Sequence, residues 1–186
     1  MKKIILSGIV LFLGNAIFAQ HVEFGLKAGV NISKLVDDAD VNANSRAGLN
    51  IGGLAHIHLS KEFAVQPEVV FSMQGASYDN DAKSTINYIN IPVLAQYMFG
   101  DGFRVQTGPQ LGFLTSAKSK IGGVTVNSKS SIQSTDFSWS FGAGYITKQH
   151  YGVDARYNLG ISDISKNNSG LKNRVWQIGL FYQFSH

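Results

Sequence analysis

The chain has 186 residues, of which 44% are apolar, 15% are charged and 20 are glycine, and it contains no cysteine. A soluble domain typically carries about 25% charged residues, so this composition does not suit an ordinary water-exposed surface. The 12 Phe and 7 Tyr residues exclude an intrinsically disordered chain, and the absence of Cys excludes a scaffold held by disulfides. The length suits one domain.

The first 19 residues have the features of a secretory signal peptide. Lys2 and Lys3 give a positive start, residues 4–13 are mostly apolar, and Ala19 is a small residue at the expected cleavage point. The apolar run is shorter than the ~20 residues of a transmembrane helix. We therefore expect a signal peptide over residues 1–19 and one domain over residues 20–186. Removal of the signal peptide leaves 14 basic and 12 acidic residues, a net charge of +2. This small net charge predicts no nucleic-acid partner.

The rest of the chain alternates apolar and polar residues with a period of two. In the first such segment, Phe24 and Leu26 fall on one face, and Gly25 and Lys27 fall on the other. Alternation over ten or more residues without a helical pattern predicts antiparallel strands, and eight strands close into a small barrel. In chain order the expected strands are residues 22–33, 49–59, 63–74, 88–99, 103–113, 136–145, 151–161 and 175–184.

The glycines decide which face points inward. Glycine packs nothing and weakens a strand, so a face rich in glycine suits a narrow interior better than a water-exposed surface. The opposite face holds nearly all the large apolar residues, which are too bulky for that interior. The sequence therefore predicts an eight-stranded antiparallel up-and-down transmembrane β-barrel, not a lipocalin-like soluble barrel. The glycines of the polar face are Gly25, Gly29, Gly52, Gly108, Gly112, Gly142, Gly144, Gly152, Gly160 and Gly179.

The connections between the expected strands alternate between short and long. Short periplasmic turns and long extracellular loops are typical of outer-membrane barrels, so we expect both termini in the periplasm. Aromatic residues gather near both ends of the strands, which predicts two aromatic girdles. The expected turns are residues 60–62, 100–102 and 148–150, and the expected loops are residues 34–45, 75–85, 116–135 and 163–173.

The last strand, Gln177 to Phe184, resembles the C-terminal signal that the outer-membrane assembly machinery recognises, although that signal usually ends on the aromatic residue and two residues follow it here. Residues 24–31, 88–94 and 108–112 add to this resemblance. A proline within a strand, as at Pro92, is restricted to bulges and edges. The whole mature chain resembles the small outer-membrane β-barrel family that includes PorT-like proteins. That resemblance implies fold and location, and it carries no agreed catalytic residues and no assumed role in protein secretion.

The candidate functional residues are the charged and histidine side chains of the expected lumen face. Lys27, Glu68 and Arg156 lie about five or six residues from their turns, and therefore at similar depth. Poorly solvated charges are costly unless they are paired, so we expect a structural network that plugs the lumen; the stagger of the strands, which decides the pairings, is not fixed by the sequence. The residues of this expected network are Glu23, Lys27, His56, His58, Glu68, Arg104, Asp154 and Arg156.

Metal chemistry and catalysis have little support. His56 and His58 share one face and could bind a metal, but polar packing accounts for them better. The acidic first loop, with Asp37, Asp38 and Asp40, lacks the spacing of an EF-hand. The long loops contain no His, which disfavours a hydrolase that depends on a Ser-His-Asp arrangement. We expect no catalytic residue, no cofactor and no metal.

These observations favour a non-enzymatic outer-membrane barrel that acts as a structural or surface-interaction protein through its long loops. The expected partners are outer-membrane lipid and lipopolysaccharide, the assembly machinery, and an unknown surface partner. Lys118, Lys120 and Lys129 make the third loop basic, so it could meet anionic lipopolysaccharide head groups or a partner, or remain a solvated loop tip. A narrow pore for small solutes is the alternative, and an outer-membrane enzyme is a weaker one.

Overall fold

The computed structural model describes residues 22–37, 44–78, 82–167 and 169–184. The predicted signal peptide, Asp38 and Asp40 lie outside these residues. Within them, no helix is long and apolar enough to cross a membrane.

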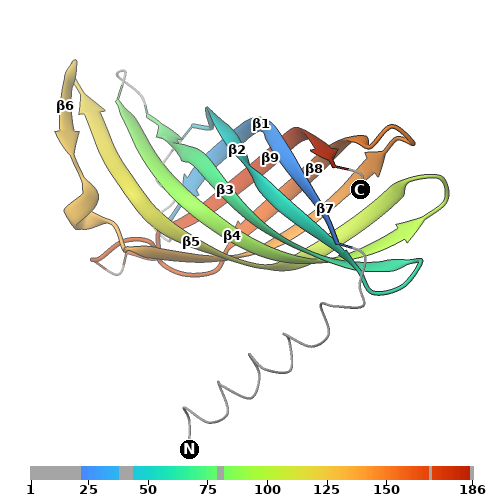
Figure 1. Ribbon diagram of the computed structural model, residues 1–186. Helices are drawn as coiled ribbons and strands as arrows, with labels where there is room; N and C mark the ends of the chain where they lie inside the picture. Colours follow the sequence, from blue (N-terminus) through green and yellow to red (C-terminus); the bar gives the residue numbers. More distant parts are fainter. Residues whose placement is uncertain (1–21, 38–43, 79–81, 168, 185–186) are drawn as a thin grey trace, which may run out of the picture.

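The described residues form nine strands and one short 3-10 helix (Figure 1). Eight strands make the barrel, which closes because β1 pairs with β9 and β4 pairs with β5. All barrel pairings are antiparallel between neighbours, which confirms the predicted up-and-down barrel. The elements are β1 (Val22–Val36), β2 (Arg46–His58), β3 (Phe63–Ser77), β4 (Lys83–Phe99), β5 (Phe103–Ile121), β6 (Val124–Asn127), η2 (Lys129–Ser131), β7 (Thr135–Ile146), β8 (Tyr151–Gly160) and β9 (Lys172–Gln183).

The apolar face points outward and the polar face points into the lumen, as the glycine distribution predicts. On β5, the outward residues from Phe103 to Phe113 are exposed, while Arg104, Gln106 and Gln110 between them are buried. Ten residues at ~3.3 Å each, tilted by ~40°, span about 25 Å along the barrel axis. That is the height of the lipid-facing band of outer-membrane barrels.

Aromatic side chains form a contact row around the end of the barrel that carries the short turns. Phe63 packs on Tyr97 with ring centroids 5.1 Å apart, and Phe103 packs on Tyr145 at 4.8 Å. At the other end, Tyr157 packs on Trp176 at 4.8 Å. Figure 1 shows the short turns and the C-terminus at one end and β6 at the opposite end. We call the end of the barrel with the short turns and the C-terminus the short-turn end, and the end with β6 the loop end.

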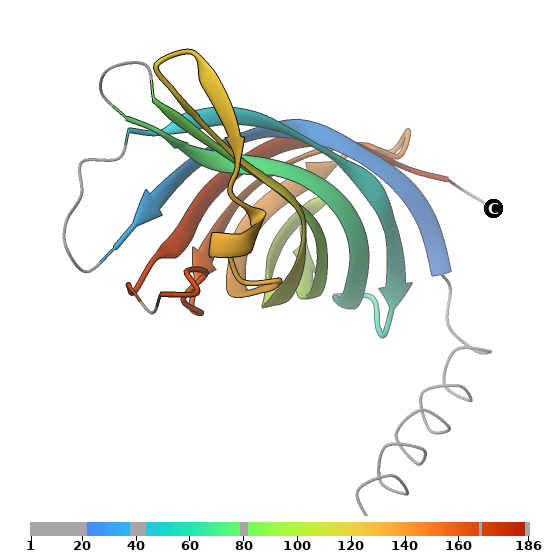
Figure 2. The same cartoon turned by 90° about the vertical axis from the view of Figure 1, so that its left-hand side faces the viewer.

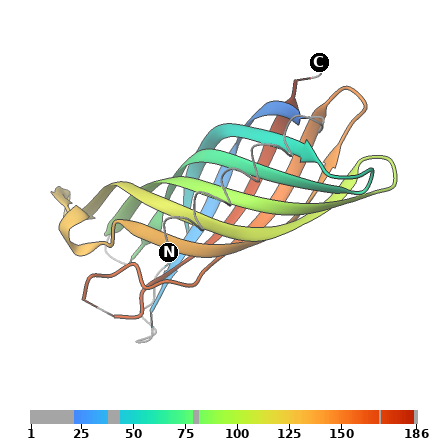
Figure 3. The ribbon, with the colours of Figure 1, turned by 60° about the horizontal axis from the view of Figure 1, so that its bottom comes forward.

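The strands are longer at the loop end than the sequence predicts. The expected loop over residues 75–85 is mostly strand, because β3 continues to Ser77 and β4 begins at Lys83. The expected loop over residues 116–135 contains the end of β5, the hairpin to β6 and the helix η2. The hairpin projects beyond the mouth of the barrel (Figures 2 and 3). The predicted bounds of these two long loops were therefore wrong, although the connections between the barrel strands still alternate between longer and shorter.

A β-bulge at Thr115 reverses the faces of β5. Tyr88 of β4 pairs with Leu114 and Asn87 pairs with Ser116, so Thr115 is skipped in the β4–β5 register, and its hydroxyl donates to the Asn87 carbonyl at 2.9 Å. An extra residue in one strand shifts its alternation by one position. Beyond the bulge Ala117 therefore points inward and is buried.

Candidate functional site

Four charged side chains meet in the middle of the lumen. The Arg156 guanidinium donates two hydrogen bonds to the Glu68 carboxylate, each 2.9 Å long, and a third of 2.9 Å to Asp154. The Lys27 ammonium lies 3.0 Å from the Asp154 carboxylate and 3.4 Å from Glu68. Gln66 also donates to Glu68, through Nε2 to Oε1 at 2.7 Å. We call Lys27, Glu68, Asp154 and Arg156 the central ion cluster.

The central ion cluster crosses the full width of the barrel. Glu68 is on β3 and Arg156 is on β8, and these strands are four positions apart in the closed sequence of eight. They therefore face each other across the lumen. All four residues are between 1% and 7% exposed, and two acids balance two bases. The charges are paired as burial requires, and the hydrogen bonds between Arg156 and Glu68 join opposite walls of the barrel.

A second polar layer lies between this cluster and the short-turn end. The Arg104 guanidinium carbon lies 4.8 Å from the centre of the Phe181 ring, and Arg104 also donates to Gln96 at 3.5 Å. His56 contacts Gln66 through Nδ1 at 3.3 Å, and its ring meets the His58 ring edge to face at 4.4 Å. Glu23 lies opposite His56 in the β1–β2 register. This layer connects with the central cluster through Gln66.

His56 and His58 lie two residues apart on β2, with their rings in contact. Within the described parts of the chain, no group of three His, Cys, Asp or Glu side chains is arranged to hold a metal ion. The edge-to-face contact of the rings and the glutamine bound to His56 account for both histidines as lumen packing.

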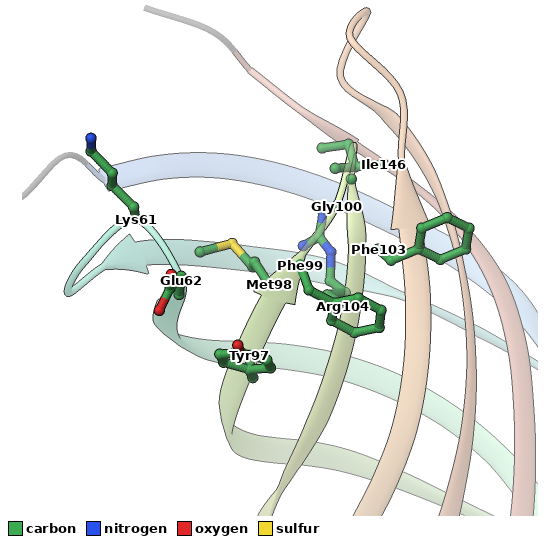
Figure 4. A pocket seen from close by; sticks show the side chains of 10 residues that line it. Lys61, Glu62, Tyr97, Met98, Phe99, Gly100, Phe103, Arg104 and Ile146 are labelled. Carbon is green, nitrogen blue, oxygen red and sulfur yellow. The ribbon is translucent and has the colours of Figure 1, made fainter.

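A cavity of about 320 Å³ opens at the short-turn end (Figure 4). It lies between the β2–β3 turn, which contributes Lys61 and Glu62, and the β4–β5 turn at Gly100. Arg104 also lines it. Residues of both faces of the wall therefore border the cavity, because Phe99 and Phe103 are exposed while Arg104 is buried.

Uncharged polar residues form a hydrogen-bonded layer inside the barrel on the loop side of the central cluster. Asn31 donates through Nδ2 to Ser72 at 2.9 Å, and its Oδ1 accepts from Asn50 at 2.8 Å and from Gln177 at 3.1 Å. These residues come from β1, β3, β2 and β9. Their amides therefore connect half of the barrel wall in one layer.

A cluster of buried apolar residues lies inside the barrel at the loop end, although apolar residues point outward over most of the barrel. We call it the apolar cap, and its buried members are Leu35, Ala76, Ile86, Tyr88, Ala117 and Ile164. Tyr78, Leu114, Ile132 and Leu171 pack against it.

The β8–β9 connection places Ile164 in the cap. Asp163 accepts backbone hydrogen bonds from Ser165 and Gly170, each 2.8 Å long, and the bond from Ser165 holds the pKa of that carboxyl below its usual value. Gln133 donates its backbone N–H to the Ile164 carbonyl at 2.7 Å. The loop is therefore tied both to itself and to the segment before β7.

The structure brings together four of the eight charged or histidine residues expected in the lumen network, and it places the other four nearer the short-turn end. The alternation did not single out the glutamines and asparagines that join the layers. Arg46, which donates to the Ser84 carbonyl at 2.8 Å and contacts Thr85 Oγ1, was not predicted either. It lies one residue after an expected loop and before the next expected strand, so no alternation indicated these contacts.

The comparisons with known proteins agree with this architecture. The profile of a family described as "Outer membrane protein beta-barrel domain" matches residues 18–166. A search of curated proteins found no significant match.

Among solved structures, Neisserial surface protein A is similar with a TM-score of 0.61 and 13% identity, over 88% of this chain and 99% of that one. Ail, the attachment invasion locus protein of Yersinia pestis, solved in complex with the heparin analogue sucrose octasulfate, is similar with a TM-score of 0.52 and 16% identity, over 88% and 99% of the two chains. At these identities the likeness shows the fold alone.

Proposed function

This chain belongs to the outer membrane protein β-barrel family, and from that premise we propose that it is a non-enzymatic, non-conducting barrel that acts as a structural or surface-interaction protein. We propose further that the short turns and both termini face the periplasm and that the loop end faces outward. The last strand, Gln177 to Phe184, would then meet the assembly machinery from the periplasmic side. The narrower resemblance to PorT-like proteins remains a prediction within this family.

The central ion cluster is the observation that supports a closed lumen. A solute would have to separate Arg156 from Glu68, whose two 2.9 Å hydrogen bonds join opposite walls. Separating a buried ion pair leaves uncompensated charges and costs several kcal/mol. The apolar cap adds a second closure on the loop side. Function is then left to the loop end, where the β5–β6 hairpin projects from the mouth (Figure 2).

Single-channel recording tests this proposal. Purified barrel in a planar bilayer should give no large, stable conductance steps, while a general porin inserted under the same conditions should give them. A folded state in the same preparation is checked by its altered migration in unheated detergent gels. Stable steps from the folded wild-type protein would overturn the closed lumen and support the alternative of a narrow pore.

A further inference from the structure

The bulge at Thr115 gives the loop end a basic outer surface. Before the bulge the odd-numbered residues of β5 face lipid, and after it the even-numbered ones do, because Ala117 is buried in the cap. Lys118 and Lys120 therefore point outward, both exposed. Without the extra residue, both lysines would point into the lumen.

A third lysine joins them from the neighbouring strand. Lys83 of β4 lies directly opposite Lys120 in the antiparallel register, and Thr85 lies opposite Lys118. Like charges placed directly opposite each other destabilise a strand pair, so a bound anion at this position would relieve a cost that the fold carries. Lys129 adds a fourth positive charge close to the bulge, where its ammonium donates to the Thr115 carbonyl at 3.0 Å. We call Lys83, Lys118 and Lys120 the lysine ladder.

The lysine ladder continues the lipid-facing surface upward from its last apolar row. Ile89 of β4 is outward and exposed, and Thr85, the partner of Lys118, is four residues further along the strand. At ~3.3 Å per residue and a tilt of ~40°, the rows of Lys118 and Lys120 lie about 10 and 15 Å beyond Ile89. The head-group layer extends roughly 5–8 Å beyond the hydrocarbon core. A flexible lysine side chain covers the remaining distance by bending toward the membrane.

We propose that the lysine ladder binds the phosphate groups of glycolipids in the outer leaflet, and so anchors the projecting β5–β6 hairpin to the membrane surface. The proposal rests on the orientation given above, in which the loop end faces outward. It names the residues and the lipid chemistry of one surface contact of this protein. The ladder lies on the same outward face as the lipid-facing band and within reach of the head-group layer beyond it, which favours a membrane lipid over a soluble polyanion.

The test measures retention of lipid A, the bisphosphorylated anchor of lipopolysaccharide, by native mass spectrometry of the full barrel in a zwitterionic detergent. Each lysine near an anionic surface contributes about fivefold in affinity, so K118Q/K120Q should bind about 25-fold more weakly. The control K61Q/K148Q makes the same charge change in exposed turns at the opposite end and should bind like the wild type. Lipid A without its phosphates should bind equally to K118Q/K120Q and to the wild type.

Two results would overturn the proposal. Equal losses in the two double variants would show an effect of net charge alone. Binding of a soluble sulfated polysaccharide through Lys118 and Lys120, without retention of lipid A, would assign the surface to a soluble partner. Neither of these results bears on conductance, so failure here and failure of the closed lumen are distinguishable.

Discussion

Replacing Glu68 with alanine should be the most damaging single change in the lumen. Its carboxylate accepts two hydrogen bonds from Arg156 and one from Gln66, and it lies 3.4 Å from the Lys27 ammonium. The variant keeps both bases, which are 1% and 4% exposed, but leaves them only Asp154 as an acidic partner. Because a buried charge is then uncompensated, we expect a loss of about 3–5 kcal/mol in the free energy of unfolding.

The double variant Glu68→Ala/Lys27→Met tests the cause of that loss. It restores charge balance, since Arg156 keeps Asp154 at 2.9 Å, and replacing both partners of a buried pair is much less costly than removing one. The double variant should therefore be more stable than Glu68→Ala alone. Asp101→Asn, in the exposed β4–β5 turn, should change stability by less than about 1 kcal/mol.

Reversible urea unfolding in lipid vesicles, followed by the fluorescence of Trp139 and Trp176, measures all three variants. These are the two tryptophans of the chain, and both lie on barrel strands. A Glu68→Ala loss no larger than that of Asp101→Asn would refute the view that the cluster is held by charge pairing. A double variant that is less stable than Glu68→Ala would refute the stranded base as the cause.

Two further predictions concern the lumen wall and the β8–β9 loop. Gly108→Leu should destabilise the barrel far more than Ala143→Leu, because a Cβ at position 108 would overlap the Val93 carbonyl oxygen while position 143 faces lipid. The same unfolding assay compares the two variants, and equal losses of stability would contradict the assignment of the inward and outward faces. The pKa of Asp163 in the folded state is lowered, so its contribution to loop order should be present above the ordinary aspartate pKa of about 3.9 and be lost as pH falls through the lower folded value. Amide hydrogen exchange in the β8–β9 loop should therefore accelerate in that acid range, and in D163N it should already be faster at neutral pH. A loop equally protected in D163N and wild type would argue against this.

The alternation of residues was enough to predict the barrel. An apolar–polar alternation with a period of two over at least ten residues indicates a β-strand, and the glycine-rich face had to point into the narrow lumen. The prediction failed where lipid no longer covers the strand. From Leu114 to Ile121 the outward positions are polar, so the strand loses its apolar face and resembles a loop. The bulged residue Thr115 also interrupts the alternation, and the hairpin to β6 follows it.

The central ion cluster could be predicted in part. Distance from the turns placed Lys27, Glu68 and Arg156 at similar depth, and the structure joins them. The pairing depends on which strands face each other and by how much each is staggered, and neither quantity is local in sequence. The apolar cap could not be predicted, and neither could the ends of the strands. Leu35, Ile86 and Ile164 lie in or beside segments whose sequence resembles loops.

The glycines and the ion cluster are two aspects of one arrangement. Lys27 pairs across the strands with Gly52, and Arg156 pairs with Gly142. Asp154 lies between two glycines, at positions 144 and 179. A Cβ at position 179 would stand 3.1 Å from the Asp154 carboxylate oxygen, which is a tight contact for a side chain that cannot move without breaking its ion pairs.

An eight-stranded barrel has room for only a few side chains across its lumen. Long charged side chains can cross it only where their neighbours on the wall are small, so each glycine beside the cluster makes space for a charge. The glycines cost backbone entropy and contribute no packing, and the buried charges would be costly if unpaired. Together they allow Arg156 to reach Glu68 on the opposite wall. A substitution that fills a glycine position next to the cluster should therefore resemble, in its effect on stability, the loss of one of the charged partners.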